Sequence, residues 1–544
     1  MNESTRVDWR SWGPEAVAEA ERTDTPILLS LTATWCGTCH EMDARTYAEP
    51  AIAANINDSF VPVRVDADRH PRVRERYNMG GFPTTAFLTP QGELLSGTTY
   101  LGPDGMRQVV DRIRERWRDK GASAGRIPRA LADEPTPAGD LDERIEEHIA
   151  GQLSEQFDPH HGGWGTEAKF PLPRTVEFAL KRERQQALQT LDAIAQHLQD
   201  TVDGGFFRFA TGGDWSDVRY EKVLDTNAAL LRAFANAYLY TGEAAYREPA
   251  ARTVEYLTDT LWTGIAVGGS QGPGQGAAYY SLSADQRADH ESPRTDLTVF
   301  AGGNALAADA LLTYYSYTDD DRARSYAERI LDALEDDLVE ADSGVVTHYR
   351  AGDETGETHL LEDAASVVTA WCRARQVLGD QRYTAVARRV ADETIDTLWD
   401  GAFRDGPARG EGLCDRPLYP IDSSVAFADG LLDLAAITGD ERYREVATDA
   451  IEAFAGAWDR IGVQVAGYGS VAARLLNGDL VVDVGDPAGS DLHRAALRVA
   501  DHETVVVPDA EGVDAGEATV RGSDAPPATD PETLIDRVSA AADR

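Results

Sequence analysis

The stretch TATWCGTCHEMDARTY, residues 32–47, places two cysteines, Cys36 and Cys39, two residues apart behind a tryptophan. The apolar run PILLSLT (26–32) before it predicts a short strand, and the residues after Cys39 predict a helix. Three interpretations fit such a pair: a redox couple, half of a zinc site, or two thiols that only pack.

A zinc site would need two further ligands at short spacing. The other cysteines, Cys372 and Cys414, stand alone in the sequence, and His40 and His70 are the nearby histidines. The sequence therefore predicts no metal site, and no motif in it calls for a cofactor.

A redox couple has more physical support. Cys36 opens the predicted helix, where free N–H groups and the helix dipole stabilise a thiolate. Cys39 follows one turn later, placed to resolve a mixed disulfide. Phe82–Pro83, in GGFPTTAF before the next predicted strand, is our candidate for the cis-proline that faces such pairs.

Outward from this stretch, the chain divides into parts of different character. Helix and strand signals alternate over residues 1–118, which predicts a small α/β domain. Residues 119–140 are rich in Gly, Ala and Pro and predict a linker. Residues 141–485 predict helix after helix, and residues 486–544 form an acidic C-terminal extension with segments that could add edge strands.

The helical part contains a weak repeat. Three similar helical segments end at Trp262, Trp399 and Trp458, each preceded by another apolar-periodic helix, so the unit is a helical hairpin. We expect a closed ring of hairpins, an (α/α)6 toroid. An open superhelix is the alternative.

The charge of the chain excludes several kinds of partner. Among 544 residues, 93 Asp and Glu stand against 52 Lys and Arg, a net charge of −41. Nucleic acid and anionic membranes are poor partners for such a surface. The polar N-terminus and the lack of a long apolar run predict a cytoplasmic protein with no membrane span. The low lysine content resembles proteins of salt-loving archaea. The oligomeric state stays open.

The segments ILLSLTATWCGTC and VPVRVDADRHPRVRERYNMGGFPTTAFL make residues 26–118 resemble a thioredoxin fold. The resemblance implies that Cys36 attacks, Cys39 resolves and Pro83 is the cis-proline. It also shows departures. Ser30 stands where thioredoxins have a buried Asp, and Pro62 stands near the place of its partner lysine.

Four further segments resemble the family typified by spermatogenesis-associated protein 20, whose members join a thioredoxin-like domain to a six-hairpin toroid: GGWGTEAKFP (162–171), GGFFRFATGGDWSDVRYEKVLDTNAAL (204–230), TDLTVFAGGNALAADALL (295–312) and DSSVAFADGLLDLAAITGDERY (422–443). Such toroids are similar to N-acylglucosamine 2-epimerases and six-hairpin glycosidases. The resemblance implies a sugar-sized pocket lined by the Gly-rich loops. Phe207 and Arg219 replace histidines of the family pattern.

The retained lysines of this nearly lysine-free chain also point to those loops, since ammonium and guanidinium are not interchangeable. Our pocket candidates are Lys169, Arg208, Asp214, Trp215, Glu221, Lys222 and Asn227. We expect a thiol–disulfide oxidoreductase acting on a protein disulfide or a small thiol, with a toroid that binds the client or a carbohydrate. The alternatives are a carbohydrate-active enzyme regulated by the small domain and a non-catalytic scaffold.

Overall fold

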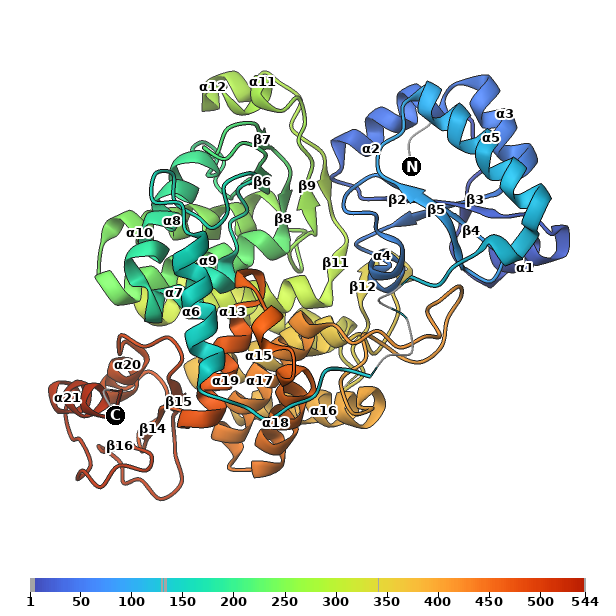
Figure 1. Ribbon diagram of the computed structural model, residues 1–544. Coiled ribbons are helices and arrows are strands. Elements are labelled where there is room, and N and C mark those ends of the chain that lie inside the picture. The colour runs from blue at the N-terminus through green and yellow to red at the C-terminus, as the bar shows by residue number, and fades with distance from the viewer. Residues whose placement is uncertain (1–4, 129–130, 132–134, 341, 543–544) are drawn as a thin grey trace. The chain divides into compact units, whose positions relative to one another are not determined.

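The computed structural model describes residues 5–128, 131, 135–340 and 342–542. The chain forms two compact units. The first contains residues 1–135 together with the short segments Gly272–Gly274 and Arg404–Leu418, and the second contains the rest of the chain. Figure 1 shows the helices and strands of both units.

A five-stranded sheet forms the centre of the first unit, in the order β1-β3-β2-β4-β5. The strands are β1 (Arg10–Ser11), β2 (Ile27–Thr32), β3 (Val61–Asp66), β4 (Thr84–Leu88) and β5 (Leu94–Thr98). β3 runs parallel to both β1 and β2, whereas β4 and β5 are antiparallel additions. β2 is buried on both faces, which explains its unbroken apolar sequence.

Helices cover both faces of this sheet. α1 (Pro14–Thr23) and α4 (Pro71–Tyr77) pack on one face. α2 (Gly37–Met42), the π-helical turn η1 (Asp43–Tyr47), α3 (Pro50–Ser59) and α5 (Pro103–Lys120) cover the other. Four of these helices begin with proline, whose missing N–H and fixed φ suit the first helical position.

Two arginines of α4 bind a segment from much later in the chain. Arg72 and Arg76 are buried, and Arg76 donates to Asp405 Oδ2 at 2.5 Å. The same two guanidinium groups donate to backbone carbonyls of Pro407, Arg409, Leu413, Cys414 and Arg416. Leu413 and Cys414 also belong to the hydrophobic core on the α1–α4 face. The segment Arg404–Leu418 is therefore an integral part of the first unit.

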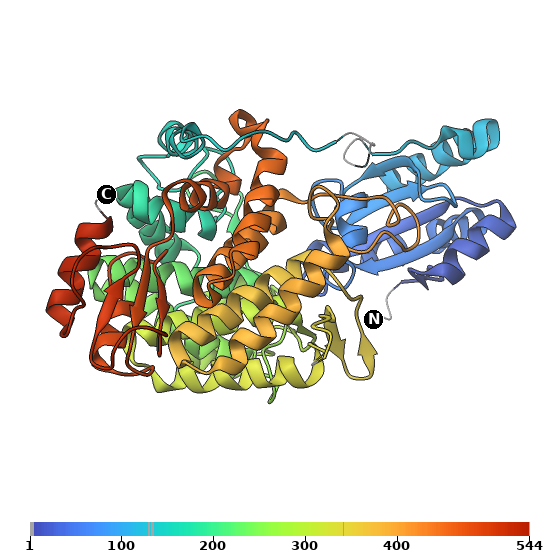
Figure 2. The same ribbon diagram turned by 90° about the horizontal axis from the view of Figure 1, so that it is seen from below.

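The second unit is a ring of helical hairpins (Figure 2). Its inner helices are α7 (Pro173–Arg182), α9 (Leu224–Thr241), α13 (Ala301–Thr318), α15 (Leu361–Leu378), α17 (Ile421–Thr438) and α19 (Gly467–Asn477). Each packs against the next, and α19 packs against α7, so the ring closes. The expected thioredoxin-like domain followed by an (α/α)6 toroid is thereby confirmed, and the open superhelix is excluded.

The outer helices of the ring are α6 (Arg144–Gln156), α8 (Arg184–His197), α10 (Ala244–Glu255), α14 (Asp321–Asp337), α16 (Gln381–Leu398) and α18 (Glu441–Ala455). They bury one face, as α14 does with five of its 17 residues. An inner helix such as α13 is buried nearly all round, with 13 of 18 residues buried. This difference follows from position, since an inner helix contacts protein on most sides.

Short strands precede two of the inner helices. β8 (Lys222–Val223) leads directly into α9, and β11 (Val299–Phe300) leads directly into α13. The Gly-rich loops lie in the connections that lead into the inner helices, as residues 160–165 do before α7 and residues 202–208 do before α9.

The C-terminal part of the second unit is a small sheet with two helices. β14 (Val481–Val484) pairs in parallel with β15 (Val505–Val507) and antiparallel with β16 (Ala518–Val520). α20 (Asp491–Leu497) and α21 (Pro531–Ala542) pack against each other. β15 packs against α15 and α17, which attaches this sheet to the ring.

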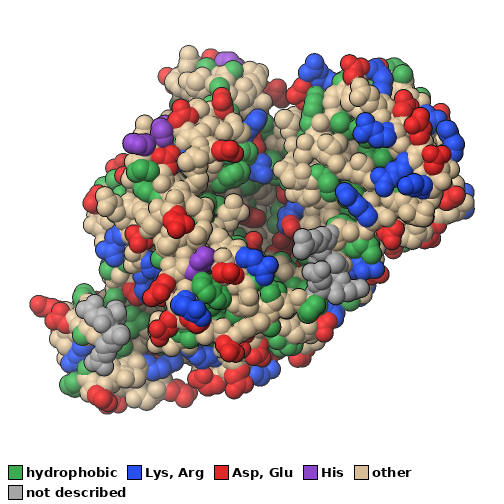
Figure 3. All heavy atoms as spheres, viewed as in Figure 1, with side chains coloured by type: hydrophobic (Ala, Val, Ile, Leu, Met, Phe, Trp, Pro, Cys, Tyr) green, Lys and Arg blue, Asp and Glu red, His purple; other side chains and the backbone are tan. Residues whose placement is uncertain are grey.

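Acidic side chains are scattered over the face shown in Figure 3 and do not gather in one patch. Among the described helices, none is both long and apolar enough to cross a bilayer.

Candidate functional site

Cys36 immediately precedes α2, in the connection from β2, and Cys39 lies within α2. The two cysteines form a disulfide. Cys36 is the N-cap residue of α2, and its sulfur accepts the backbone N–H of Cys39 at 3.1 Å. An N-cap position supplies both this N–H and the positive end of the helix dipole. The local fold thus provides what a thiolate at Cys36 needs.

The proline loop lies beside the pair. The Phe82–Pro83 peptide bond is cis. The Thr38 hydroxyl donates to the Phe82 carbonyl at 3.1 Å and lies 3.5 Å from the sulfur of Cys36. The structure therefore brings the three predicted redox residues, Cys36, Cys39 and Pro83, to one place.

Trp35 forms one wall of this site. Its indole N–H donates to Asp68 Oδ2 at 2.6 Å, and its ring meets that of Phe82 edge to face at 5.8 Å. These contacts hold the residue before Cys36 in a fixed orientation.

The disulfide is covered. Cys36 is 3% exposed and Cys39 is 2% exposed. Pro273, from the segment Gly272–Gly274 of the same unit, lies over the start of α2, because a Cβ on Gly37 would stand 3.1 Å from its Cγ.

Below the pair, the position of the missing thioredoxin Asp is occupied by a buried hydroxyl. Ser30 is fully buried and pairs in the sheet with Thr85, which is also buried. The buried carboxylate of Asp43, four residues after Cys39, is bound by Arg64, with one contact of 3.1 Å. The ring of Trp9 lies 4.4 Å from the same guanidinium group.

Lys169 and Lys222, the two lysines that the sequence indicates, each bind an Asp and backbone carbonyls of a Gly-rich loop. Lys169 Nζ is fully buried and donates to Asp158 Oδ2 at 2.9 Å and to two loop carbonyls, those of Gly162 and Gly165. Burial by itself would raise the pKa of Asp158, but the Lys169 ammonium and nearby backbone N–H groups lower it. Lys169 is thus a brace inside the first loop.

Lys222 makes the equivalent brace in the next loop. Its Nζ donates to Asp200 Oδ2 and to the Gly204 carbonyl, each at 2.8 Å. Burial lowers the pKa of Lys222 to about 8, although Asp200 opposes the shift. Asp200 is also bound by Arg287 at 2.8 Å.

The remaining candidate residues of this region each make their own local contacts. Asn227 donates to the Phe206 carbonyl and accepts its N–H, which ties the second loop to α9. Trp215 is buried and donates to the His161 carbonyl at 2.9 Å. Arg208 pairs with Glu221 at 3.3 Å. Asp214 accepts the Ser216 hydroxyl at 2.5 Å.

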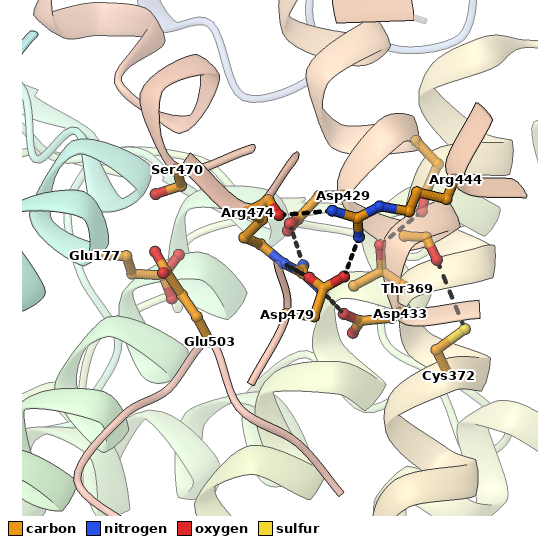
Figure 4. Close-up of polar contacts among 12 residues, drawn as sticks. Glu177, Thr369, Cys372, Asp429, Asp433, Arg444, Ser470, Arg474, Asp479 and Glu503 are labelled. Atoms are coloured by element: carbon orange, nitrogen blue, oxygen red, sulfur yellow. Dashed lines mark hydrogen bonds and ion pairs between the residues drawn. The ribbon is translucent and has the colours of Figure 1, made fainter. Parts of the chain in front are cut away.

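A different set of side chains lines a cavity of about 80 Å³ along the inside of the ring (Figure 4). None of the seven pocket candidates is among them. The lining is highly charged and comes from the inner helices and from residues 502–504. Its ionisable members are Arg174, Glu177, Arg232, Arg373, Asp429, Asp433, Arg474, His502 and Glu503.

Sequence reasoning missed this cavity, although a signal was present. Arg232 sits inside the apolar run TNAALLRAFANAY, and Asp429 and Asp433 sit inside VAFADGLLDL. A charged residue in the middle of a buried helix has to face a partner or a cavity.

Three comparisons with known proteins bear on the two units. Residues 1–133 match a family model described as Thioredox_DsbH, protein of unknown function, DUF255. Human spermatogenesis-associated protein 20 is 30% identical over 292 residues, which cover 47% of this chain and 37% of that protein. A probable protein disulfide-isomerase A6 from Medicago sativa is 30% identical over 130 residues, 24% of this chain and 34% of that protein.

Among solved structures, a cellobiose 2-epimerase from Spirochaeta thermophila aligns with a TM-score of 0.45 and 19% identity, covering 56% of this chain and 83% of that one. A GH76 alpha-mannanase from Bacteroides thetaiotaomicron aligns with a TM-score of 0.45 and 12% identity, covering 64% of this chain and 99% of that one.

The match to the first curated relatives spans just over a third of their length. Over about half of its own length, this chain is related in sequence to spermatogenesis-associated protein 20, and its first unit is a thioredoxin-like domain with a Cys36–Cys39 pair.

Proposed function

We propose that the chain is a thiol–disulfide oxidoreductase that works through Cys36 and Cys39. The observation that carries the proposal is the disulfide at the N-terminus of α2, linked through Thr38 to the cis-proline loop. The sequence relationship of the first unit to disulfide isomerases supports it.

The exchange takes two steps. In the reduced pair, the Cys36 thiolate attacks one sulfur of a client disulfide, forms a mixed disulfide and releases the other client sulfur as a thiolate. Cys39 then loses its proton and attacks Cys36 Sγ, which closes the Cys36–Cys39 disulfide and releases the second client sulfur. Two electrons pass from the pair to the client, and an external thiol must reduce the pair again.

The surroundings assign the roles. Cys36 takes the attacking role because the Cys39 N–H and the helix dipole stabilise its thiolate. Cys39 takes the resolving role because it lies one turn further into α2. Pro83 and the Phe82 carbonyl form the surface against which the client backbone would lie.

The ring would select the client, or bind a small ligand that tunes the exchange. We propose the cytoplasm as the compartment, since a reducing thiol pool would regenerate the pair there. A carbohydrate-active ring remains the second candidate, favoured by the charged cavity inside it.

Disulfide reduction by the full chain tests the proposal. With dithiothreitol as the donor and insulin as the client, we expect the wild type to accelerate reduction and Cys36→Ser to abolish the acceleration. Cys39→Ser should accumulate a mixed disulfide that mass spectrometry detects. Cys372→Ala, at a buried free cysteine of α15, is the matched control and should keep the activity. Equal rates for all four proteins would refute the proposal.

A further inference from the structure

Arg174 is an unmatched cation inside the ring. It lies in the first turn of α7, lines the cavity and is exposed to it. Within the described residues, its guanidinium group has neither a hydrogen bond nor an ion pair. A guanidinium group that lines a cavity without a protein partner can bind a ligand oxygen, and its planar fork suits carboxylate and phosphate groups.

The other cations of the cavity are already matched. Arg232 binds Glu177 at 2.6 Å and Asp309 at 2.7 Å. Arg373 shares Asp309 at 3.2 Å. Each of these guanidinium groups thus has its counter-charge within the protein.

Arg474 is matched in the same way. It binds Asp429 at 2.6 Å, and both Asp433 and Asp479 at 2.7 Å (Figure 4).

The carboxylates of the cavity are also committed. Glu177, Asp429 and Asp433 are held by the arginines just described. Glu503 is bound by Lys181 at 2.8 Å and by Arg182 at 2.9 Å. Within the described residues, none of these carboxylates forms an ion pair with Arg174, so its guanidinium group is available to a ligand in the cavity.

The surroundings of Arg174 disfavour its positive charge. Desolvation, and then the nearby Arg232, lower the pKa of Arg174, while Glu177 and Asp429 only partly offset them. A guanidinium group stays protonated in proteins, so Arg174 keeps its positive charge in the cavity. An oxyanion in the cavity would give this guanidinium group a charge-assisted hydrogen-bond partner.

Hydroxyl groups beside the cavity add hydrogen-bond donors. Thr504 lines it and is 8% exposed, and its buried Oγ1 has no hydrogen-bond partner among the described residues. Ser470 also lines the cavity, and its nearest recorded contact is Arg182 at 3.5 Å. A buried hydroxyl without a partner is uncommon and suits a site for an oxygen-bearing ligand.

The size suits a small group. A cavity of about 80 Å³ exceeds several times the ~15 Å³ that one water needs. We propose that this cavity binds the oxyanion group of a small metabolite, a carboxylate or a phosphate, with Arg174 as its counter-ion and Thr504 as a hydrogen-bond donor. This site is independent of the thiol–disulfide exchange proposed for the first unit.

Calorimetric titration of the full chain tests the site with three probes at constant ionic strength: inorganic phosphate, glucuronate and glucose. Glucuronate and glucose differ by the carboxylate, so the comparison isolates the charge. We expect phosphate, glucuronate or both to bind the wild type and glucose to bind at least tenfold more weakly. Phosphate binding alone would identify a phosphorylated metabolite, and glucuronate binding alone would identify a carboxylate.

Variants locate the binding. Arg174→Gln should weaken anion binding at least tenfold, whereas Arg324→Gln, at an exposed arginine of the outer helix α14, should leave it unchanged. Cys36→Ser should also keep anion binding, which separates this site from the redox proposal. Should Arg174→Gln fail to fold, Thr504→Val gives a second probe of the same cavity, expected to weaken binding by several-fold.

Three results would overturn the proposal. One is the absence of binding by both anions at tens of millimolar. Another is binding of glucose as tight as that of glucuronate and phosphate. The third is unchanged anion affinity in folded Arg174→Gln or, if that variant does not fold, in Thr504→Val.

Discussion

At the scale of single residues, Lys169 and Lys222 are constrained, as the sequence predicts, but they hold loops together and do not line the cavity. Lys169 and Lys222 were singled out because the chain has almost no other lysine. Both are fully buried, and each binds an Asp and the carbonyls of a Gly-rich loop. A compact ammonium fits between converging carbonyls where a planar guanidinium would not. Composition could reveal that these positions are constrained, but it could not reveal that the constraint is a loop brace.

His493 gives a prediction on pH at the same scale. Its Nδ1 accepts the Gly489 N–H at 3.0 Å, and its Nε2 donates to the Gln376 carbonyl at 2.7 Å, so the neutral ring satisfies both contacts. Burial, assisted by Arg375, lowers the pKa of His493 from its ordinary value of 6.5, although the Gln376 carbonyl opposes the shift. Protonation would break the contact with Gly489.

The unfolded chain therefore takes up this proton before the folded one does. The stabilisation is fully present above pH 6.5 and is lost as the pH falls, by at most about 1.4 kcal/mol per pH unit. Urea unfolding of the wild type and His493→Gln between pH 8 and pH 5 should show a shallower loss for the variant. His290→Gln, at an exposed histidine, should follow the wild type. Parallel curves for all three proteins would contradict the assignment.

At the scale of elements, the sequence predicts the order of β2, the Cys36–Cys39 pair, α2 and the Phe82–Pro83 turn before β4, because each of these signals is local. The ring was predictable because its hairpins repeat. The sequence does not predict that the segments Gly272–Gly274 and Arg404–Leu418 belong to the first unit. Neither a Gly-Pro-Gly triplet nor a polar loop carries a signal for the distant residues that it contacts. The cavity was not predictable for a related reason: its lining comes from several inner helices and from residues 502–504, which are far apart in the sequence.

Pro273 gives a prediction at this scale. Its ring lies against Gly37 at the start of α2, next to the buried disulfide, so we expect it to limit access to the two sulfur atoms. Pro273→Gly removes the ring and loosens the segment, so we expect dithiothreitol to reduce Cys36–Cys39 several-fold faster, measured by timed alkylation of the released thiols. Pro526→Gly makes the same change at an exposed site near the C-terminus and should leave the rate unchanged. A rate equal to the wild type in Pro273→Gly would show that access is limited elsewhere.

At the scale of the whole molecule, the net charge of −41 sets the response to salt. Acidic side chains spread over the surface repel one another, and added salt screens that repulsion. We expect the midpoint of thermal unfolding to rise steadily as KCl increases from 0.05 M to about 2 M. Sucrose at equal osmolality is the control, because it is excluded from protein surfaces without screening charge. A midpoint that falls with KCl would contradict this account.

The segment Arg404–Leu418 has a practical consequence. The family model that matches this chain ends at residue 133, which suggests a convenient place to cut the gene. A protein trimmed there would keep Arg72 and Arg76 but lose Asp405 and the carbonyls that accept their hydrogen bonds. It would also lose two side chains, Leu413 and Cys414, from its own interior. The first unit is thus built from three stretches of sequence, and engineers who want to transplant it must carry all three.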